Sequence, residues 1–218
     1  MKRNFLKLST LLIVSLLFTV GCDKSNDPNN SGDSNNPATT DVGVVINGVK
    51  WATRNVDAFG TFAATPESAG MLYQWNRKKA WSATDETVAD WDTTYPSGWA
   101  WEKVNDPSPK GWRVPTAEEQ RSLLDTDKVT SEWTTQNGVT GRKFTDKTSG
   151  KSIFLPAAGY RGGSDGTLLN AGADGGYWDS VAYEFNETGA YYLDFNSDDT
   201  NVYYANRRDG QPVRCVAE

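Results

Sequence analysis

Two Asn-Gly pairs, each flanked by residues that favour strands, set the pattern of this 218-residue chain. Asn47-Gly48 separates residues 44–46 from 49–53, and Asn137-Gly138 separates 133–136 from 139–144. Asn and Gly accept the positive φ angles that a two-residue hairpin turn requires. Further short segments rich in Tyr, Val and Phe are separated by Gly, Asn and Asp, at residues 152–155, 177–180, 190–195, 202–205 and 212–216. This pattern predicts antiparallel sheet built from short strands.

Helices are predicted at two places. Thr116 and Glu119 form a capping box, in which the Thr hydroxyl accepts from the amide three residues on and the Glu carboxylate accepts from the amide of the cap. The spacing of Met71, Leu72 and Trp75 predicts a second helix over residues 66–75. The expected class is therefore α+β: a twisted antiparallel sheet with one or two short helices and long loops.

The N-terminal segment has the properties of an export signal. Basic residues precede an apolar run over 8–20, which is too short to cross a bilayer, so residues 1–21 are predicted to be a lipoprotein signal peptide. Gly21-Cys22 resembles the cleavage box of bacterial lipoproteins, in which the Cys becomes the lipidated first residue. An ordinary cleaved signal with an incidental Cys22 is the alternative.

The polar composition of residues 22–41 predicts a disordered tether, and residues 42–218 are predicted to form a single globular domain. We therefore expect an exported protein, lipid-anchored at the bacterial outer membrane and facing the cell surface. Removal of the leader leaves 19 basic and 28 acidic residues, a net charge of −9. This acidic balance disfavours nucleic acid as a partner, and membrane contact is expected through the lipid alone.

The absence of His limits the chemistry available to this chain. It excludes Ser-His-Asp and Cys-His catalysis and His-ligated zinc or haem. Two Cys residues cannot form a cysteine-rich metal site. We expect no cofactor and no enzyme activity, although a hydrolase that uses two carboxylates stays open because it needs neither residue type.

Five motifs, in this order along the chain, resemble the Fibrobacter succinogenes major paralogous domain (FISUMP), which is common in lipoproteins of Bacteroidetes. They are GVKWATRNV at 48–56, NDPSPKGWRVPT at 105–116, LPAAGYR at 155–161, GYWDS at 176–180 and VRCV at 213–216. The resemblance covers essentially the whole globular part. It implies a compact, distantly C-type lectin-like α+β domain with a long central insert on one side of a curled sheet. Because members of this family have no settled activity, it implies no reaction.

Many members of the family carry a Cys-Pro pair before the Gly-Trp motif, and the resemblance implies that this Cys pairs with the Cys of the closing Val-Arg-Cys-Val strand. Here the first position is Ser108, so Cys215 has lost its partner. We expect Cys215 to pack as a small buried hydrophobe. An exposed, reactive thiol is the alternative.

Nine Trp residues are the most conspicuous source of binding surface. Indole rings stack on sugar rings and form hot spots of protein interfaces. Those in the strand-like or family-matching motifs are expected to pack in the core: Trp51, Trp112, Trp133 and Trp178. Four others lie in a segment without periodicity that is rich in Asp, Thr, Ser and Gly: Trp81, Trp91, Trp99 and Trp101. They are candidate ligand-binding residues, and the alternative is that they fix the long loop to the domain.

One segment has some features of a calcium loop. Asp194, Asn196 and Asp198 place oxygen-bearing side chains at alternating positions. Asp199 stands where such a loop needs Gly, and Ala205 stands where it needs Glu. A polar turn between two Tyr-rich strands is therefore preferred to a calcium site, and these three residues stay as candidates only.

The function expected from these features is a cell-surface binding or adhesion module whose ligand is a glycan or an extracellular protein. A structural accessory subunit of a surface assembly such as a fimbria is the first alternative, and a carboxylate hydrolase is the second. Exposed Trp residues would favour the binding or adhesion module. A bare strand edge or a large apolar patch would favour the assembly subunit.

Overall fold

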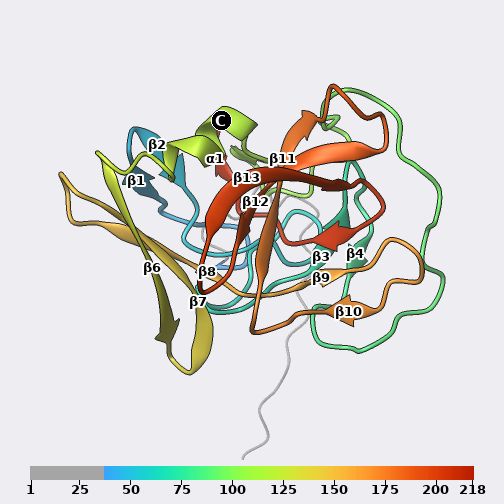
Figure 1. Cartoon of the computed structure of the whole chain (residues 1–218), viewed down its shortest axis with the longest axis horizontal. Helices are drawn as coiled ribbons and strands as arrows, with labels where there is room; N and C mark the ends of the chain where they lie inside the picture. Colours follow the sequence, from blue (N-terminus) through green and yellow to red (C-terminus); the bar gives the residue numbers. More distant parts are fainter. Residues whose placement is uncertain (1–36) are drawn as a thin grey trace, which may run out of the picture. The chain divides into compact units, whose positions relative to one another are not determined.

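The computed structural model describes residues 37–218, which lie within one compact unit (Figure 1). The predicted signal peptide, Cys22 and most of the predicted tether lie outside the described residues. Within the described part, no helix has the length and apolar character needed to span a membrane.

The expected α+β, C-type lectin-like class is wrong. Strands account for 37% of the structure and helix for 3%, so the fold is nearly all β. Among the described residues the α-helical content is a single element of six residues, α1 (Ala117–Ser122). The strands form four small antiparallel sheets instead of one large twisted sheet.

Two of the four sheets combine strands from distant parts of the chain, and the other two each consist of three consecutive strands (Figure 1). The first has the order β1 (Val44–Ile46), β2 (Val49–Trp51), β15 (Val216–Ala217), β5 (Trp112–Arg113). The second has the order β10 (Leu168–Leu169), β9 (Tyr160–Arg161), β14 (Gly210–Gln211), β3 (Leu72–Gln74), β4 (Ala80–Trp81). The third is β11 (Gly175–Ala182), β12 (Gly189–Phe195), β13 (Thr200–Asn206). The fourth is β6 (Val129–Gln136), β7 (Val139–Asp146), β8 (Ser152–Pro156).

Both predicted Asn-Gly hairpins are confirmed. Asn47 and Gly48 have φ angles of 46° and 83°, and Ile46 pairs with Val49 across the turn. The second turn has the same left-handed pair of residues and connects β6 to β7. The side chain of a β-branched residue would clash with the backbone at these φ angles, which explains the Asn-Gly choice.

The capping box is confirmed, but the second predicted helix is wrong. The Thr116 hydroxyl accepts from the Glu119 amide, and the Glu119 carboxylate accepts from the Thr116 amide. Residues 66–75 instead contain β3, which pairs with β4 and β14. All three residues of β3 are buried. A strand with both faces buried lacks the alternation of apolar and polar residues that marks a half-buried strand. The spacing of its apolar residues was therefore interpreted as helical.

The strand predicted over residues 212–216 is also wrong in extent. Of these residues only Val216, the first residue of β15, lies in a strand, because β14 already ends at Gln211. Pro212 has no amide hydrogen to give to a ladder. Residues 212–215 instead accept single hydrogen bonds from two other parts of the chain. The Ala52 amide donates to the Cys215 carbonyl, and the Trp178 amide donates to the Pro212 carbonyl.

Aromatic residues fill two apolar clusters. One surrounds Trp75 and Trp178, and the other surrounds Trp51 and Phe195. The predicted core positions of Trp51, Trp112 and Trp178 are confirmed by their burial. The remaining predicted core residue, Trp133, is partly buried and its ring meets Phe195 edge-on at 6.3 Å.

Cys215 is fully buried and unpaired, as expected for a packed thiol. Burial raises the pKa of Cys215, and the charge of Arg214 and the neighbouring Ser108 side chain oppose this only in part. Ser108 Oγ is itself buried and makes no hydrogen bond of ordinary geometry. The two positions that the family resemblance pairs are therefore neighbours in space.

The described residues that precede residue 42, the start of the predicted domain, contact the domain. Asp41 Oδ2 accepts from the Thr53 hydroxyl and pairs with Arg54 Nε at 3.2 Å. The Phe62 amide donates to the carbonyl of Ala38. The last residues of the predicted tether are thus bound to the domain.

Candidate functional site

Of the four candidate tryptophans, Trp99 offers a free ring face. Its side chain is 61% exposed, whereas Trp81 and Trp101 are buried. Trp91 is partly buried and packs on the Trp81 ring, with the ring centroids 4.7 Å apart. The structure therefore narrows the candidate set to Trp99, and the other three rings hold the long loop against the domain.

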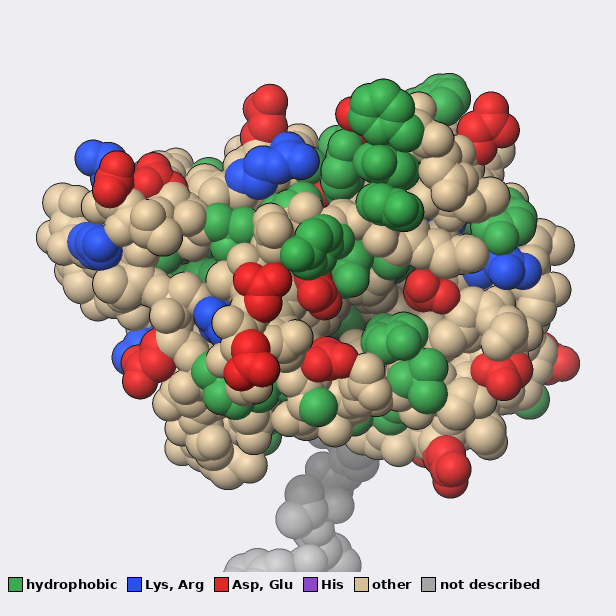
Figure 2. Space-filling model, viewed as in Figure 1, with side chains coloured by type: hydrophobic (Ala, Val, Ile, Leu, Met, Phe, Trp, Pro, Cys, Tyr) green, Lys and Arg blue, Asp and Glu red, His purple; other side chains and the backbone are tan. Residues whose placement is uncertain are grey.

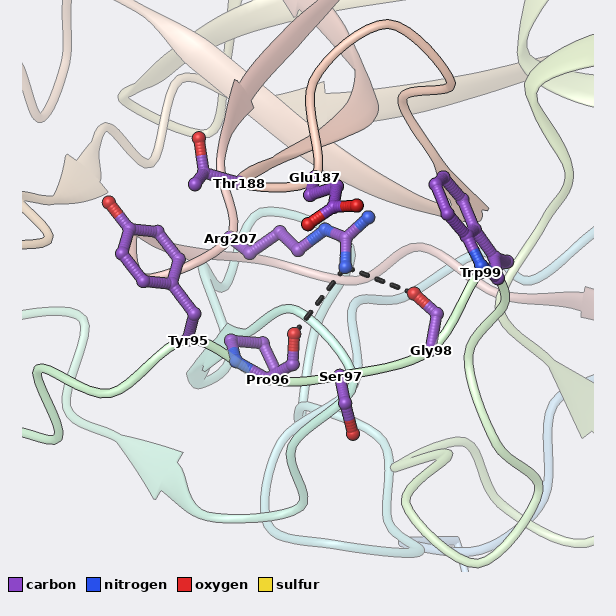
Figure 3. Close-up of a pocket in the computed structure, with 8 residues that line it drawn as sticks. All are labelled: Tyr95, Pro96, Ser97, Gly98, Trp99, Glu187, Thr188 and Arg207. Atoms are coloured by element: carbon purple, nitrogen blue, oxygen red, sulfur yellow. Dashed lines mark hydrogen bonds between the residues drawn. The ribbon is translucent and has the colours of Figure 1, made fainter.

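Trp99 lies at the edge of a cavity of about 450 Å³ (Figure 3). This volume falls in the range of small-molecule sites. Three segments line the cavity: the loop 95–99, the connection between β11 and β12, and the residue that follows β13. The lining residues are Tyr95, Pro96, Ser97, Gly98, Trp99, Glu187, Thr188 and Arg207.

Arg207 crosses the floor of this cavity and is 3% exposed. Its Nε donates to the Gly189 carbonyl at 2.8 Å, and its Nη1 donates to the Gly98 carbonyl at 3.0 Å. The guanidinium also lies over the Trp75 ring, 4.6 Å from the centroid. Nη2 has no hydrogen-bond partner among the described residues, so one donor group of the guanidinium is unused.

The loop that carries Trp99 is held by hydrogen bonds at several points. Asn76 Nδ2 donates to the Ser97 carbonyl at 3.0 Å, and the Ala182 amide donates to the Trp99 carbonyl at 3.0 Å. Tyr95 receives a hydrogen bond from Asn206 Nδ2 on its hydroxyl, and its ring lies under the Arg208 guanidinium at 4.5 Å. The aromatic groups of the cavity are therefore positioned before any ligand arrives, which lowers the entropic cost of binding.

The chemistry of this cavity suits recognition. Trp99 and Tyr95 supply aromatic surface, Arg207 supplies a donor and Glu187 supplies an acceptor. Glu187 is the single carboxylate among the lining residues, whereas glycoside hydrolysis by the usual mechanism needs two. An aromatic face surrounded by a few polar groups is the arrangement expected for a neutral polyhydroxylated ligand.

The calcium candidates do not converge on one point. Asn196 Oδ1 accepts from the amides of Asp198 and Asp199 and so stabilises a turn. Asp194 lies in β12 and lines a different cavity. Among the residues that the structure describes, no group of three or more His, Cys, Asp or Glu side chains is placed to hold a metal ion.

Trp99 was the one lining residue among the candidates, and the side chains that the sequence analysis missed include Tyr95, Glu187, Thr188 and Arg207. No local motif marks them, because the loop that carries Tyr95 is about 90 to 110 positions away from the other two segments of the cavity. The isolated bridge between Ala100 and Val181 brings the Trp99 loop to β11, and this pairing is not visible in either segment alone.

A family model described as a domain of unknown function (DUF8237) matches residues 128–216. The match includes β11 to β13 and Arg207 but not the loop that carries Trp99. No curated protein and no solved structure matches the chain.

Proposed function

We propose that this domain is a binding module whose cavity beside Trp99 holds a sugar residue of an extracellular glycan. The observation that carries the proposal is the exposed Trp99 ring at the edge of a preformed cavity whose floor is a buried arginine with an unused donor. The C–H face of a sugar ring stacks on indole, and its hydroxyls accept from or donate to the polar groups nearby.

The proposed setting rests on the sequence. The leader, Cys22 and the polar segment that follows support an exported, FISUMP-type lipoprotein held at the outer membrane by its lipid. A ligand at the cell surface fits this location. The negative net charge of the chain disfavours nucleic acid and anionic lipid as direct partners of the domain. The proposed partners are therefore a glycan outside the cell and the membrane through the anchor alone.

Replacing Trp99 with Ala is expected to weaken glycan binding about tenfold or more, since the stacking surface is lost. A glycan array probed with the wild-type chain identifies the ligand, and titration calorimetry then compares the variants. Phe59→Ala is the matched control, because Phe59 is also an exposed aromatic residue but does not line the cavity. Binding that survives in Trp99→Ala, or an array with no binding at all, would remove the proposal.

An assembly subunit is the second candidate, supported by an exposed aromatic cluster on the hairpin of β11 and β12 and on β13. Tyr183 stacks on Tyr204 with centroids 4.0 Å apart, and Phe185 beside them is 80% exposed. β13 is also a terminal strand of its sheet. Exposed apolar surface at a sheet edge is typical of protein contacts.

If this surface joins copies of the chain, wild-type protein self-associates with rising concentration in sedimentation velocity, whereas Phe185→Ser stays monomeric. The polar side chain removes the most exposed apolar group of the cluster without touching the core. Wild-type protein that sediments as a monomer at every concentration would exclude self-assembly through this cluster.

A further inference from the structure

A second cavity, of about 290 Å³, lies between the second and third sheets, away from Trp99. It is lined by Tyr160, Asn170, Asp174, Gly176, Tyr192, Asp194, Asp209 and Gln211. None of these residues lines the first cavity. Figure 2 shows acidic side chains gathered near the centre of the face over β11 to β13, with few Lys or Arg side chains between them.

Three aspartates contribute negative charge to this cavity without a basic partner. In the described part of the chain the ion pairs involve other carboxylates, so Asp174, Asp194 and Asp209 are not neutralised by contact. The Arg208 charge reaches Asp209 only as a minor influence on its pKa. A cleft lined by charges of one sign attracts ions of the opposite sign.

Burial makes two of these carboxylates, Asp194 and Asp209, costly to leave unpaired. Desolvation raises the pKa of Asp209 to about 6. It also raises the pKa of Asp194; the Tyr192 hydroxyl opposes this in part, and the nearby charges of Asp174 and Asp199 add to it. A bound cation would replace the lost hydration of these groups and stabilise their ionised forms.

Gln211 points independently to a ligand. Gln211 is 2% exposed, and its Oε1 has no hydrogen-bond partner among the described residues. This oxygen lies directly over Gly176, where a Cβ would come within 2.2 Å of it. A buried acceptor without a donor is costly, and a donor group on a ligand in this cavity would satisfy it.

The aromatic residues of the cavity fit the same ligand. Tyr192 and Asp194 are two residues apart on β12 and so share one face of the strand. Tyr160 contributes a second ring. Tyrosine rings attract cations through their faces, which adds to the attraction of the carboxylates.

A metal ion does not suit this arrangement, since no three carboxylates in the described residues are grouped closely enough to coordinate one. The acceptors are spread around a cavity that is larger than an ion needs. We propose that this cavity is a second binding site, which takes a primary ammonium group carried on a small organic molecule or side chain. Such a group has three donors, and these can be shared among separated acceptors.

The test uses two amines and their neutral derivatives, measured by titration calorimetry on the full chain at low salt. Glucosamine represents an amino sugar, and Nα-acetyl-lysinamide represents a lysine side chain. N-acetylglucosamine and Nα,Nε-diacetyl-lysinamide are the neutral controls. At least one amine should bind about tenfold or more tightly than its neutral derivative. Whichever amine binds identifies the source of the ammonium group.

Asp194→Asn is expected to weaken amine binding about tenfold, because it removes one desolvated charge and keeps the shape of the side chain. Asp174→Asn, in a less buried loop, provides a second variant with the same charge change. Asp198→Asn lies on the exposed turn outside the cavity and should leave binding unchanged.

Three results would overturn the proposal: neither amine binds, the neutral derivatives bind as tightly as the amines, or Asp198→Asn weakens binding as much as the two cavity variants. Sugar that binds through the glycan site is lost in Trp99→Ala, whereas the extra affinity of an amine over its neutral derivative should be unchanged in this variant. With Trp99→Ala as the background, the failure of the glycan site and the failure of this site therefore give different results.

Discussion

Replacing Ser108 with Cys is expected to raise the free energy of unfolding by about 4 to 5 kcal/mol under oxidising conditions, through a disulfide with Cys215. The bridge would close a loop of roughly 100 residues, and the chain-entropy model gives this magnitude for a loop of that length. The resemblance to the FISUMP domain implies this pairing, and the structure places the two side chains next to each other.

The local environment favours the bridge. Ser108 Oγ is buried without a hydrogen bond of ordinary geometry, so its replacement by sulfur removes no satisfied polar contact. The Ser108 amide donates to Asp106 Oδ1 at 2.9 Å, and this backbone contact is independent of the side chain. Cys215 is fully buried, so the bridge would be shielded from reductants in solution.

Urea denaturation of wild type and Ser108→Cys, each with and without reductant, measures the effect. Thiol titration after unfolding without reductant, with Cys22 replaced by Ser in both proteins, should find no thiol in the variant and one in the wild type. Ser108→Ala is the control for loss of the hydroxyl and should change stability little. An oxidised variant that retains both thiols, or that is no more stable than its reduced form, would contradict the prediction.

Features encoded within a few residues were predictable from the sequence. The turn at Asn47-Gly48 depends on positive φ angles that few other residues accept, and the helix at Thr116 depends on a cap that closes within four residues. The segment around Leu72 was not predictable in this way. It becomes a strand because β14, more than 130 residues away, pairs with it.

In the candidate site, too, residue types were predictable from the sequence, whereas features that depend on distant contacts were not. Trp99 was a candidate because of its residue type, yet nothing local distinguished it from Trp81 or Trp101. Its exposure depends on which rings the loop buries against the domain, and this is settled by contacts such as that of Asn76 with Ser97. Arg207 was not a candidate, because its role follows from carbonyls of Gly98 and Gly189 that only the folded chain brings to it.

The burial of Asp179 predicts an unusual pH dependence of the free energy of unfolding. Asp179 lies in β11 and is fully buried, with Oδ1 accepting from the Val181 amide at 2.7 Å. Oδ2 has no partner among the described residues. Burial raises the pKa of Asp179 to about 8, and the Val181 amide and the Arg121 charge only partly oppose this.

The direction of the effect follows from proton binding. Unfolded Asp has a pKa of about 3.9, so between about pH 4 and about pH 8 the folded chain holds a proton that the unfolded chain has lost. The free energy of unfolding should therefore fall as the pH rises through this window, by up to about 1.4 kcal/mol per pH unit from this residue. Above about pH 8 both states are ionised and the contribution of Asp179 becomes constant.

Asp179→Asn should remove this contribution, because the amide keeps the acceptor for Val181 and carries no charge at any pH. The variant should resemble wild type at about pH 4 and below and exceed its stability by several kcal/mol near about pH 9, as measured by urea denaturation across the range. Asp198→Asn, on an exposed turn, should keep the wild-type slope. Equal slopes for wild type and Asp179→Asn would show that Asp179 is ionised in the folded chain at neutral pH. The carboxylate would then have to be stabilised by a group that its Oδ2 does not contact in this structure.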